Sequence, residues 1–407
     1  MRPHLVLLLF VLLLPLYVFA TGGIVSVKDF GAKGDGVADD TEAIKKAVMS
    51  AEENGIIYFP PGKYRVKETI EVKGKCLLGN PKGAWNADMD VLPTLIIDHL
   101  EGPGLHLLDG ASVSGLCFQY EHKPSVPQKF APTILLSGVG INISDIKIHG
   151  CYDGIIADGK NNIGRLKIRN VFIAQCHNIA VYITRTYDVA TLELIHIWSP
   201  ASPTSLSQGV GIKLGRNDEI HLSNCFVFHT NIAYLFEMDE GEGGGATYGT
   251  LVNCATDYCS RGYVIKSPVK LNIIGGDLWN HHCSIYIDDR SADVRVQGVY
   301  MQSNGEPCVV VKRGKVLNIQ GSSFRSAFAR PNIFSLSAEK IGDLIVNSCD
   351  FDENAPAIKL EKEIGSAIIT NNIFPSSFTD IEKPDSLQGN ILIEHNLKRS
   401  VRDEAEN

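Results

Sequence analysis

Three charged residues suited to proton transfer occupy equivalent places in a loosely repeating sequence. Glu237, Lys266 and Asp288 each follow a short apolar run, and such runs recur at intervals of roughly 22 to 29 residues. Carboxylates act as acids, bases and nucleophiles in glycoside cleavage. If the runs are stacked strands, Glu237 and Asp288 lie two layers apart, with backbones separated by roughly 9 to 10 Å. That separation is near the upper end of the ~6.5 to 9.5 Å typical of inverting hydrolysis.

Residues near the beginning of the same runs offer a second set of proton-transfer groups. His229, Asp257 and His281 are predicted to line the rim of a groove centred on Glu237, Lys266 and Asp288. A histidine beside a carboxylate in such a place can transfer a proton. His282 and Glu306 are further candidates. No third ligand at a recognisable spacing accompanies the adjacent histidines, so no metal site and no cofactor is predicted, and calcium is an option without a supporting motif.

Strand alternation selects the residues that would contact a ligand. If Ile179, Val181 and Ile183 point inward, Tyr182 and Thr184 point outward. The same parity places the candidate substrate-binding residues on the outer face: Tyr182, Lys213, Tyr286 and Lys312. The outermost row would read Asp158, Thr184, Gly215, Glu237, Lys266, Asp288, Lys312. Such a row is also what a surface ion-pair ladder looks like, with no chemistry attached.

These residues require a solenoid of short strands to position them. Segments such as LSNCFVFH, LVNCATDY, IGGDLWN and VQGVYMQ share a polar or glycine corner between apolar strands. These repeats lack the 3.6-residue periodicity of helices. Each repeat instead contains short apolar runs separated by turns, which predicts a parallel β-helix with three short strands in each coil. The predicted corner positions are Asp145, Asn170, His196, Asn224, Asn253, Gly276, Gly298, Gly321, Ser348 and Asn372.

Ten cysteines are spread through the apolar runs without any Cys-x-x-Cys pair. This distribution is typical of buried small hydrophobic residues rather than of a zinc site or a disulfide-dense fold. Cys225 and Cys254 each follow a corner asparagine, so we expect them to stack as thiols or to form a bridge between neighbouring coils.

The glycine-containing segment VKDFGAKGDGVADDTEAI at 27–44 resembles a nucleotide loop only superficially. Its spacing reverses the dinucleotide fingerprint, and no Gly-Lys-Ser/Thr follows. Asp39 and Glu42 are predicted to cap a helix at about 41–53, whose apolar face includes Ile44 and Val48. The segment GIIYFPPGKYRV then predicts strand, turn and strand.

Together, VKDFGAKGDGVADDTEAI and IIYFPPGKYRV resemble the N-terminal signature of the pectate-lyase-like superfamily, which includes rhamnogalacturonase and epimerase-like proteins. The resemblance implies an all-β, right-handed parallel β-helix with an N-terminal capping α-helix. It also implies glycan binding along the outside of one sheet. It does not specify a reaction, because the superfamily contains lyases, hydrolases, epimerases and adhesins. The polygalacturonase motifs are absent apart from Asp288-Asp289.

The N-terminal residues predict export of the chain. Arg2 and the apolar run from Leu5 to Phe19 predict a signal peptide, 1–20, cleaved after Ala20. We expect one β-helix domain over 21–396, no membrane insertion after cleavage, and a charged, disordered tail over 397–407. A net charge of −8 argues against nucleic acid as a partner. Oligomeric state stays open.

These observations predict a secreted or periplasmic protein that cleaves a polysaccharide, either as a glycoside hydrolase or as a polysaccharide lyase. The alternative is a non-catalytic, glycan-binding or surface-associated β-helix, which the missing catalytic motifs favour.

Overall fold

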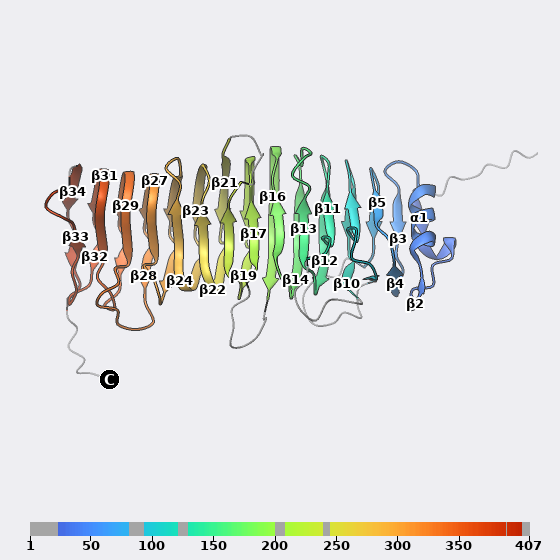
Figure 1. Ribbon diagram of the computed structural model, residues 1–407, viewed down its shortest axis with the longest axis horizontal. Coiled ribbons are helices and arrows are strands. Elements are labelled where there is room, and N and C mark those ends of the chain that lie inside the picture. Colours follow the sequence, from blue (N-terminus) through green and yellow to red (C-terminus); the bar gives the residue numbers. More distant parts are fainter. Residues whose placement is uncertain are drawn as a thin grey trace, which may run out of the picture.

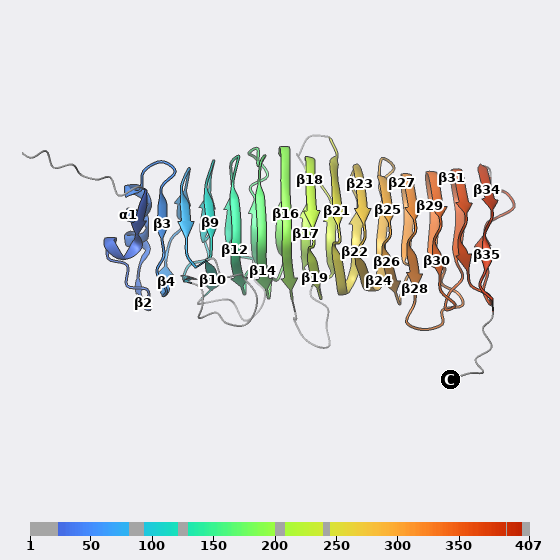
Figure 2. The same ribbon diagram turned by 180° about the vertical axis from the view of Figure 1, so that it is seen from behind.

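The computed structural model describes residues 23–80, 93–120, 129–199, 208–238, 245–387 and 389–400. Its strands stack side by side in chain order from the capping helix to the C-terminal end, as both views show (Figures 1 and 2). Paired strands are parallel, and equivalent residues of successive coils lie in register, as Ile146, Val171 and Ile195 do. The predicted parallel β-helix is therefore confirmed.

The strands of the first coils are β1 (Ile24–Ser26), β2 (Asp35–Asp39), β3 (Ile56–Tyr58), β4 (Lys63–Val66), β5 (Ile70–Val72), β6 (Cys76–Leu78), β7 (Thr94–Ile97), β8 (Leu105–Leu107), β9 (Ser112–Ser114), β10 (Cys117–Tyr120) and β11 (Ile134–Leu136). The central strands are β12 (Asn142–His149), β13 (Asp153–Ala157), β14 (Lys167–Ala174), β15 (Ile179–Ile183), β16 (Thr186–Trp198), β17 (Val210–Leu214), β18 (Asn217–Ser223), β19 (Phe226–Phe228), β20 (Ile232–Phe236), β21 (Thr247–Val252), β22 (Ala255–Ile265), β23 (Val269–Ile274) and β24 (Asp277–Asp288). The last coils contain β25 (Asp293–Gln297), β26 (Tyr300–Ser303), β27 (Val309–Gln320), β28 (Ser323–Arg325), β29 (Leu336–Asn347), β30 (Asp350–Phe351), β31 (Ile358–Thr370), β32 (Ile373–Phe374), β33 (Ile381–Glu382), β34 (Asn390–Glu394) and β35 (Leu397–Lys398).

A tight corner in the left-handed region of backbone space separates two of the three sheets. Asn224 and Asn253 have φ near +50°. The backbone N–H of Asn224 donates to the Val252 carbonyl, and that of Asn253 donates to the Ile274 carbonyl. Asparagine and glycine tolerate this conformation best, which explains their recurrence. Two predicted corner positions were wrong, by one or two residues: the corner lies at Leu194 rather than His196 and at Asn371 rather than Asn372. At the predicted corner Gly276, the preceding Gly275 has positive φ as well.

The core is one continuous column of inward-facing aliphatic and aromatic side chains. Tyr234 and Tyr263 are fully buried, and their rings stack with centroids 4.7 Å apart. Each hydroxyl donates to a backbone carbonyl, Tyr234 to Cys225 at 3.1 Å and Tyr263 to Cys254 at 3.2 Å. The polar ends of these large side chains are therefore satisfied inside the core.

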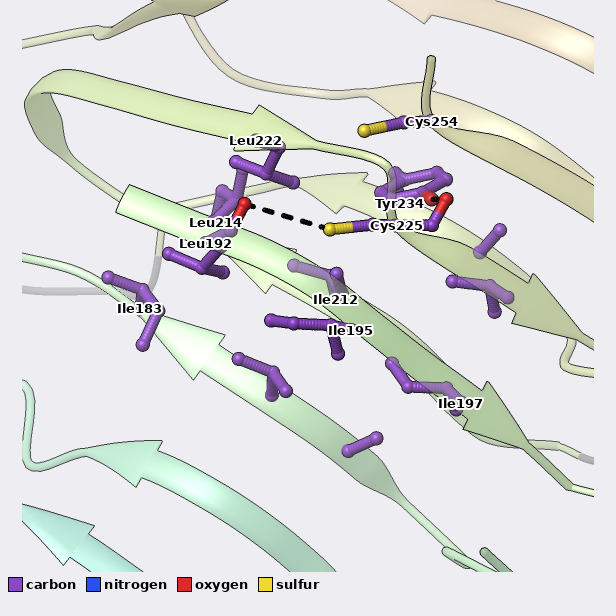
Figure 3. Close-up of a cluster of buried hydrophobic side chains, with 14 of the residues drawn as sticks. Ile183, Leu192, Ile195, Ile197, Ile212, Leu214, Leu222, Cys225, Tyr234 and Cys254 are labelled. Atoms are coloured by element: carbon purple, nitrogen blue, oxygen red, sulfur yellow. Dashed lines mark hydrogen bonds between the residues drawn. The ribbon is translucent and has the colours of Figure 1, made fainter. Parts of the chain in front are cut away.

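All ten cysteines are free thiols, and nine of them are buried. Cys225 and Cys254 lie on neighbouring coils at the edge of this core (Figure 3). Their thiols stack without a bridge, which is the first of the two predicted arrangements. The Cys225 thiol donates toward the carbonyls of Leu192 and Ser223.

The helix α1 (Thr41–Ser50) covers the first coil, and the 3₁₀ helix η1 (Val27–Phe30) precedes it. Ile44 and Ala47 are fully buried, as their spacing predicts. The helix ends before residue 53, and its N-cap is Asp40 rather than Asp39. The Asp39 carboxylate still accepts from the amide of Thr41 at 3.0 Å.

The glycine loop is filled by the chain itself. The amides of Lys33 and Gly34 donate to the two carboxylate oxygens of Asp40, at 2.6 and 2.9 Å. Both amides of this loop are therefore hydrogen-bonded within the chain.

At the other end, β35 pairs with β32, and Arg399 forms an ion pair with Asp350. The ordered solenoid therefore extends beyond residue 396, and the predicted disorder is wrong for 397–400. The predicted signal peptide, residues 200–207 and 239–244, and the tail beyond 400 lie outside the described residues.

Candidate functional site

The predicted catalytic row is a surface of ion pairs. The Lys266 ammonium lies 3.2 Å from the Glu237 carboxylate. Arg313 Nε lies 2.6 Å from the carboxylate of Asp288, because a bulge after Ile287 shifts the register and brings Arg313 opposite Asp288 in place of Lys312. We call this surface the ion-paired edge; it comprises Glu237, Lys266, Asp288, Lys312, Arg313, Glu339 and Lys362.

Glu339 is the centre of this edge. It is bonded by Lys312 and Lys362, whose hydrogen bonds hold the pKa of the Glu339 carboxyl below its usual range. The pKa of Lys312 is raised by the same bond. Each charge is thus partnered by an opposite charge, and a paired lysine is a poor base.

The predicted substrate-binding residues differ in their accessibility. Tyr182 and Lys213 are each only 7% exposed, with the Lys213 ammonium 4.8 Å from the centre of the Tyr182 ring. Thr184 is fully buried and accepts from the amide of Arg216 at 3.1 Å. These three residues, which were predicted to lie on the outer face, are therefore covered rather than exposed. Tyr286 is half-buried, with the guanidinium of Arg261 4.8 Å from the centre of its ring.

The predicted rim residues do not surround the ion-paired edge. Asp257 lies near the start of the long strand β22, whereas Lys266 directly follows its end. His281 occupies the corresponding bend of β24, and Asp288 is that strand's last residue. The rim residues and the edge therefore lie at opposite ends of the same strands, on different faces of the solenoid.

His229, Asp257 and His281 instead border a second surface, formed by outward residues of β14, β16, β19, β22, β24 and β26. Register aligns Trp198, Phe228 and Asp257 in one column and His196, Phe226 and Ala255 in another. Because Thr256 pairs with Leu278, the columns continue to Trp279 and Asp277. We call this surface the aromatic face; it comprises Phe172, His196, Trp198, Phe226, Phe228, Asp257, Tyr258, Asp277, Trp279 and Tyr300.

Large aromatic side chains are accessible on this face. Trp198 is 43% exposed, and Tyr258 and Trp279 are each 48% exposed. The two tryptophans are three coils apart, about 14 Å along the solenoid. Exposed aromatic rings on a flat sheet offer apolar platforms on which the faces of sugar rings can lie.

Two carboxylates stand among these rings without partners. Asp257 is half-buried and Asp277 is exposed. Within the part of the chain that the structure describes, neither carboxylate accepts a side-chain hydrogen bond or forms an ion pair. They are diagonal neighbours on adjacent coils, so their backbones are separated by roughly 8 Å. A similar separation of the two carboxyl groups would fall inside the ~6.5 to 9.5 Å range of inverting hydrolysis.

Strained backbone marks the border of the aromatic face. His229 has φ +61° and Tyr258 has φ +57°, conformations that bulky residues rarely adopt. The amide of His229 donates to the Asp257 carbonyl at 3.0 Å, which ties the two bends together. Strain of this kind persists where surrounding structure imposes it, and it clusters at functional sites.

The two bends collect ionisable rings. The Tyr258 ring meets His281 edge-on at 4.3 Å and lies 5.5 Å from His229. Burial, together with the neighbouring His282 and His229, lowers the pKa of His281, against a smaller opposite effect of Asp257. His281 is therefore neutral at neutral pH and able to accept a proton. His229 is 4% exposed, and its Nδ1 lies 3.0 Å from the Ser199 carbonyl.

Glu306 belongs to a separate cluster. Arg261 Nη2 donates to both of its carboxylate oxygens at 2.7 and 3.0 Å, and His282 approaches one of them at 4.0 Å. Glu306 is thereby held as an ion pair, unlike Asp257.

Among the described residues, no three metal-ligating side chains of His, Cys, Asp or Glu gather into a group. No helix in those residues is long and apolar enough to cross a membrane.

Sequence reasoning missed Trp198, Tyr258, Asp277 and Trp279. The sequence does contain a signal for them. The corner segments LVNCATDY and IGGDLWN alternate inward and outward residues in the same way as the strand that contains Ile179, Val181 and Ile183. Applying that parity to these segments places Asp257, Asp277 and Trp279 on one outer face.

Comparison with known proteins supports the fold. The family model described as "Rhamnogalacturonase A/epimerase, pectate lyase-like" matches residues 24–91. Mannuronan C5-epimerase AlgE6 of Azotobacter vinelandii is 50% identical over 54 residues, which is 13% of this chain and 6% of that protein. The match to this relative is therefore confined to a small part of its length.

Two solved structures extend the likeness over the solenoid. The catalytic unit of a GH87 α-1,3-glucanase from Streptomyces thermodiastaticus has a TM-score of 0.55 and 14% identity, covering 93% of this chain and 69% of that one. The tailspike protein of E. coli bacteriophage HK620, solved in complex with a pentasaccharide, has a TM-score of 0.58 and 10% identity, covering 91% and 78%. The resemblance to pectate-lyase-like parallel β-helix proteins is confirmed at the level of the N-terminal signature and the fold.

Proposed function

We propose that this protein is a carbohydrate-active β-helix that binds a polysaccharide along the aromatic face and hydrolyses it there. The observation that carries the proposal is the pair of carboxylates, Asp257 and Asp277, which stand among aromatic side chains and have no side-chain hydrogen bond or ion pair with any described residue. The α-1,3-glucanase and the glycan-bound tailspike, which share the fold, support carbohydrate as the ligand class.

The two carboxylates differ in environment, which suggests different roles. Asp257 is half-buried, and a glycan laid over it would exclude further water from its carboxyl group. Asp257 is therefore the candidate acid that protonates the leaving oxygen. Asp277 is exposed to solvent, so it is the candidate base that activates a water on the other side of the sugar ring.

The charges of the aromatic face favour a neutral glycan over a polyuronate. Between β16 and β24 its two columns contain Asp257 and Asp277, Ala255, His196 and aromatic residues, and no lysine or arginine. The cations stand at the ends, where Lys147 lies 5.3 Å from the centre of the Phe172 ring and Arg325 lies 5.8 Å from that of Tyr300. A polyanion would meet its own charge sign in the middle of this surface.

A non-catalytic glycan-binding protein is the second candidate. It is favoured by the absence, among the described residues, of hydrogen bonds that would orient Asp257 or Asp277, since catalytic carboxylates are usually held in place by neighbours.

The test is mass spectrometry of the products after the purified protein is incubated with neutral polysaccharides (glucans, mannan, xylan) and uronic-acid polymers (alginate, pectate). Fragments that carry an added water support hydrolysis, and they should come from the neutral set. Unsaturated fragments would indicate a lyase and overturn the carboxylate roles. Binding without any fragments would favour the second candidate.

Secretion remains a proposal that rests on the predicted signal peptide. Expression of the full chain in an exporting host, followed by N-terminal sequencing, should find a mature chain that begins at Thr21.

A further inference from the structure

A shallow depression lies on a different sheet, around the tight corner from the aromatic face. It spans three coils, β23, β25 and β27, and its polar lining consists of Asn272, Arg295, Gln297, Asn318 and Gln320. Asn272, Arg295 and Asn318 are in register, as are Gln297 and Gln320. We call this surface the amide depression.

The four amide side chains of the depression do not satisfy one another. None of them makes a side-chain hydrogen bond with any residue that the structure describes. Elsewhere on the same sheet, equivalent positions do pair: Ser144 donates to Ser114 at 3.0 Å, and Asn347 Nδ2 donates to Thr370 at 3.1 Å. The amide depression is therefore not a simple continuation of a structural ladder.

One polar atom in the depression lacks the partner that its burial demands. Asn318 Oδ1 is buried and accepts no hydrogen bond from the described residues. Leaving such an acceptor unpaired is destabilising, so the atom calls for a water or ligand as its partner. Arg295 lies beside it, 60% exposed and only loosely held by Asp293 at 3.6 Å, so it can move aside for a donor.

We infer that the amide depression is a second carbohydrate-binding site. Amides present a donor and an acceptor side by side, which matches the hydroxyl groups of a sugar, and the lining contains no aromatic ring for stacking. With Arg295 facing Asp293, the local charge is balanced, and a neutral glycan fits better than an ionic one. This inference rests on the proposed function, since the second site holds another segment of the same polymer.

Two sites on one rigid solenoid act together only on a long chain. A polymer that spans both sites gains an effective local concentration at the second, whereas an oligosaccharide fills one site at a time. The amide depression should therefore increase affinity for polymers without changing turnover of short substrates.

The test is affinity electrophoresis in gels containing a soluble neutral glucan, mannan or galactan. The variants are Asn272→Ala/Gln320→Ala, Trp279→Ala and the triple combination, with Asn347→Ala as an amide control outside the depression. We expect the double variant to lose about tenfold or more in apparent polymer affinity. Trp279→Ala should retain part of the retardation, and the triple variant none.

The outcomes separate the two proposals. If the double variant migrates like wild type, the second site is overturned while the aromatic face stands. If Trp279→Ala has no effect and the double variant abolishes retardation, the aromatic face is wrong and the depression is the principal site. If no neutral polysaccharide retards the wild-type protein, both are overturned.

Discussion

The ion-paired edge and the aromatic face contain the same acidic residue types with opposite partners. On the edge, Glu237 and Asp288 are paired with Lys266 and Arg313. On the aromatic face, Asp257 and Asp277 form no ion pair with any residue that the structure describes, and they stand among exposed rings. Exposed ion pairs contribute little to stability and occupy the charged groups, whereas a carboxylate without such a pair, beside exposed aromatic rings, is available to a ligand. On this solenoid, a row of charged residues therefore indicates a candidate site only where the charges are not already neutralised by ion pairs.

The largest expected effect is a loss of hydrolytic activity in variants of the aromatic face but not in variants of the ion-paired edge. Replacing Asp257 or Asp277 by Asn should reduce hydrolysis by about 10²- to 10⁴-fold, because each substitution removes a proton-transfer group. The matched variants Glu237→Gln and Asp288→Asn should stay within about twofold, since surface ion pairs have small effects. Product formation is measured on the polysaccharide that wild type cleaves. Loss of activity in the edge variants alone would reverse the assignment.

A smaller effect is expected on binding. Trp279→Ala should weaken glycan affinity about tenfold, which corresponds to ~1.4 kcal/mol for a lost stacking platform. Tyr248→Ala is the control, because Tyr248 is an exposed aromatic residue on a different sheet. Titration calorimetry measures both, and equal losses would mean that the aromatic face has no special role.

The edge should matter for stability, and only slightly. Glu339→Gln removes the partner of both Lys312 and Lys362, so we expect a loss of about 0.2–1 kcal/mol per pair in the free energy of unfolding. The loss should shrink in 1 M salt, where exposed charges are screened. Urea unfolding at two salt concentrations provides the measurement, and a loss that salt leaves unchanged would argue against this screened ion-pair account.

The smallest expected effect is a pH dependence from the aromatic face. His281 has a lowered pKa in the folded state, so the unfolded chain binds the proton first as pH falls below the ordinary histidine value of about 6.5. Stability should therefore decrease as pH falls from 6.5 toward the lowered value. His281→Asn should reduce that decrease in melting experiments. His99 and His196 have lowered pKa values too, so part of the acid sensitivity should remain.

The fold could be predicted because its physical requirements recur in every coil. Corners such as Asn224 and Asn253 need residues that tolerate positive φ, and inward positions need apolar side chains of limited volume. These demands leave a periodic trace in the sequence. The N-terminal signature then identified the cap, where Asp40 rather than a phosphate occupies the glycine loop.

The site could be predicted only in part, because ion pairing depends on register across coils. The bulge after Ile287 brings Arg313 opposite Asp288, and no feature of the sequence reveals that shift. Burial of Tyr182 and Lys213 likewise depends on tertiary packing rather than on strand parity. Asp257 and His281 were found, but their grouping with the aromatic rings required the bent path of β22 and β24.

The most direct test of the central claim is a crystal structure of the Asp257→Asn variant soaked with an oligosaccharide of the polysaccharide that wild type binds. We expect sugar rings over Trp198 and Trp279, with a glycosidic oxygen near residue 257. Sugar density over Glu237 and Asp288, with the aromatic face empty, would contradict the account.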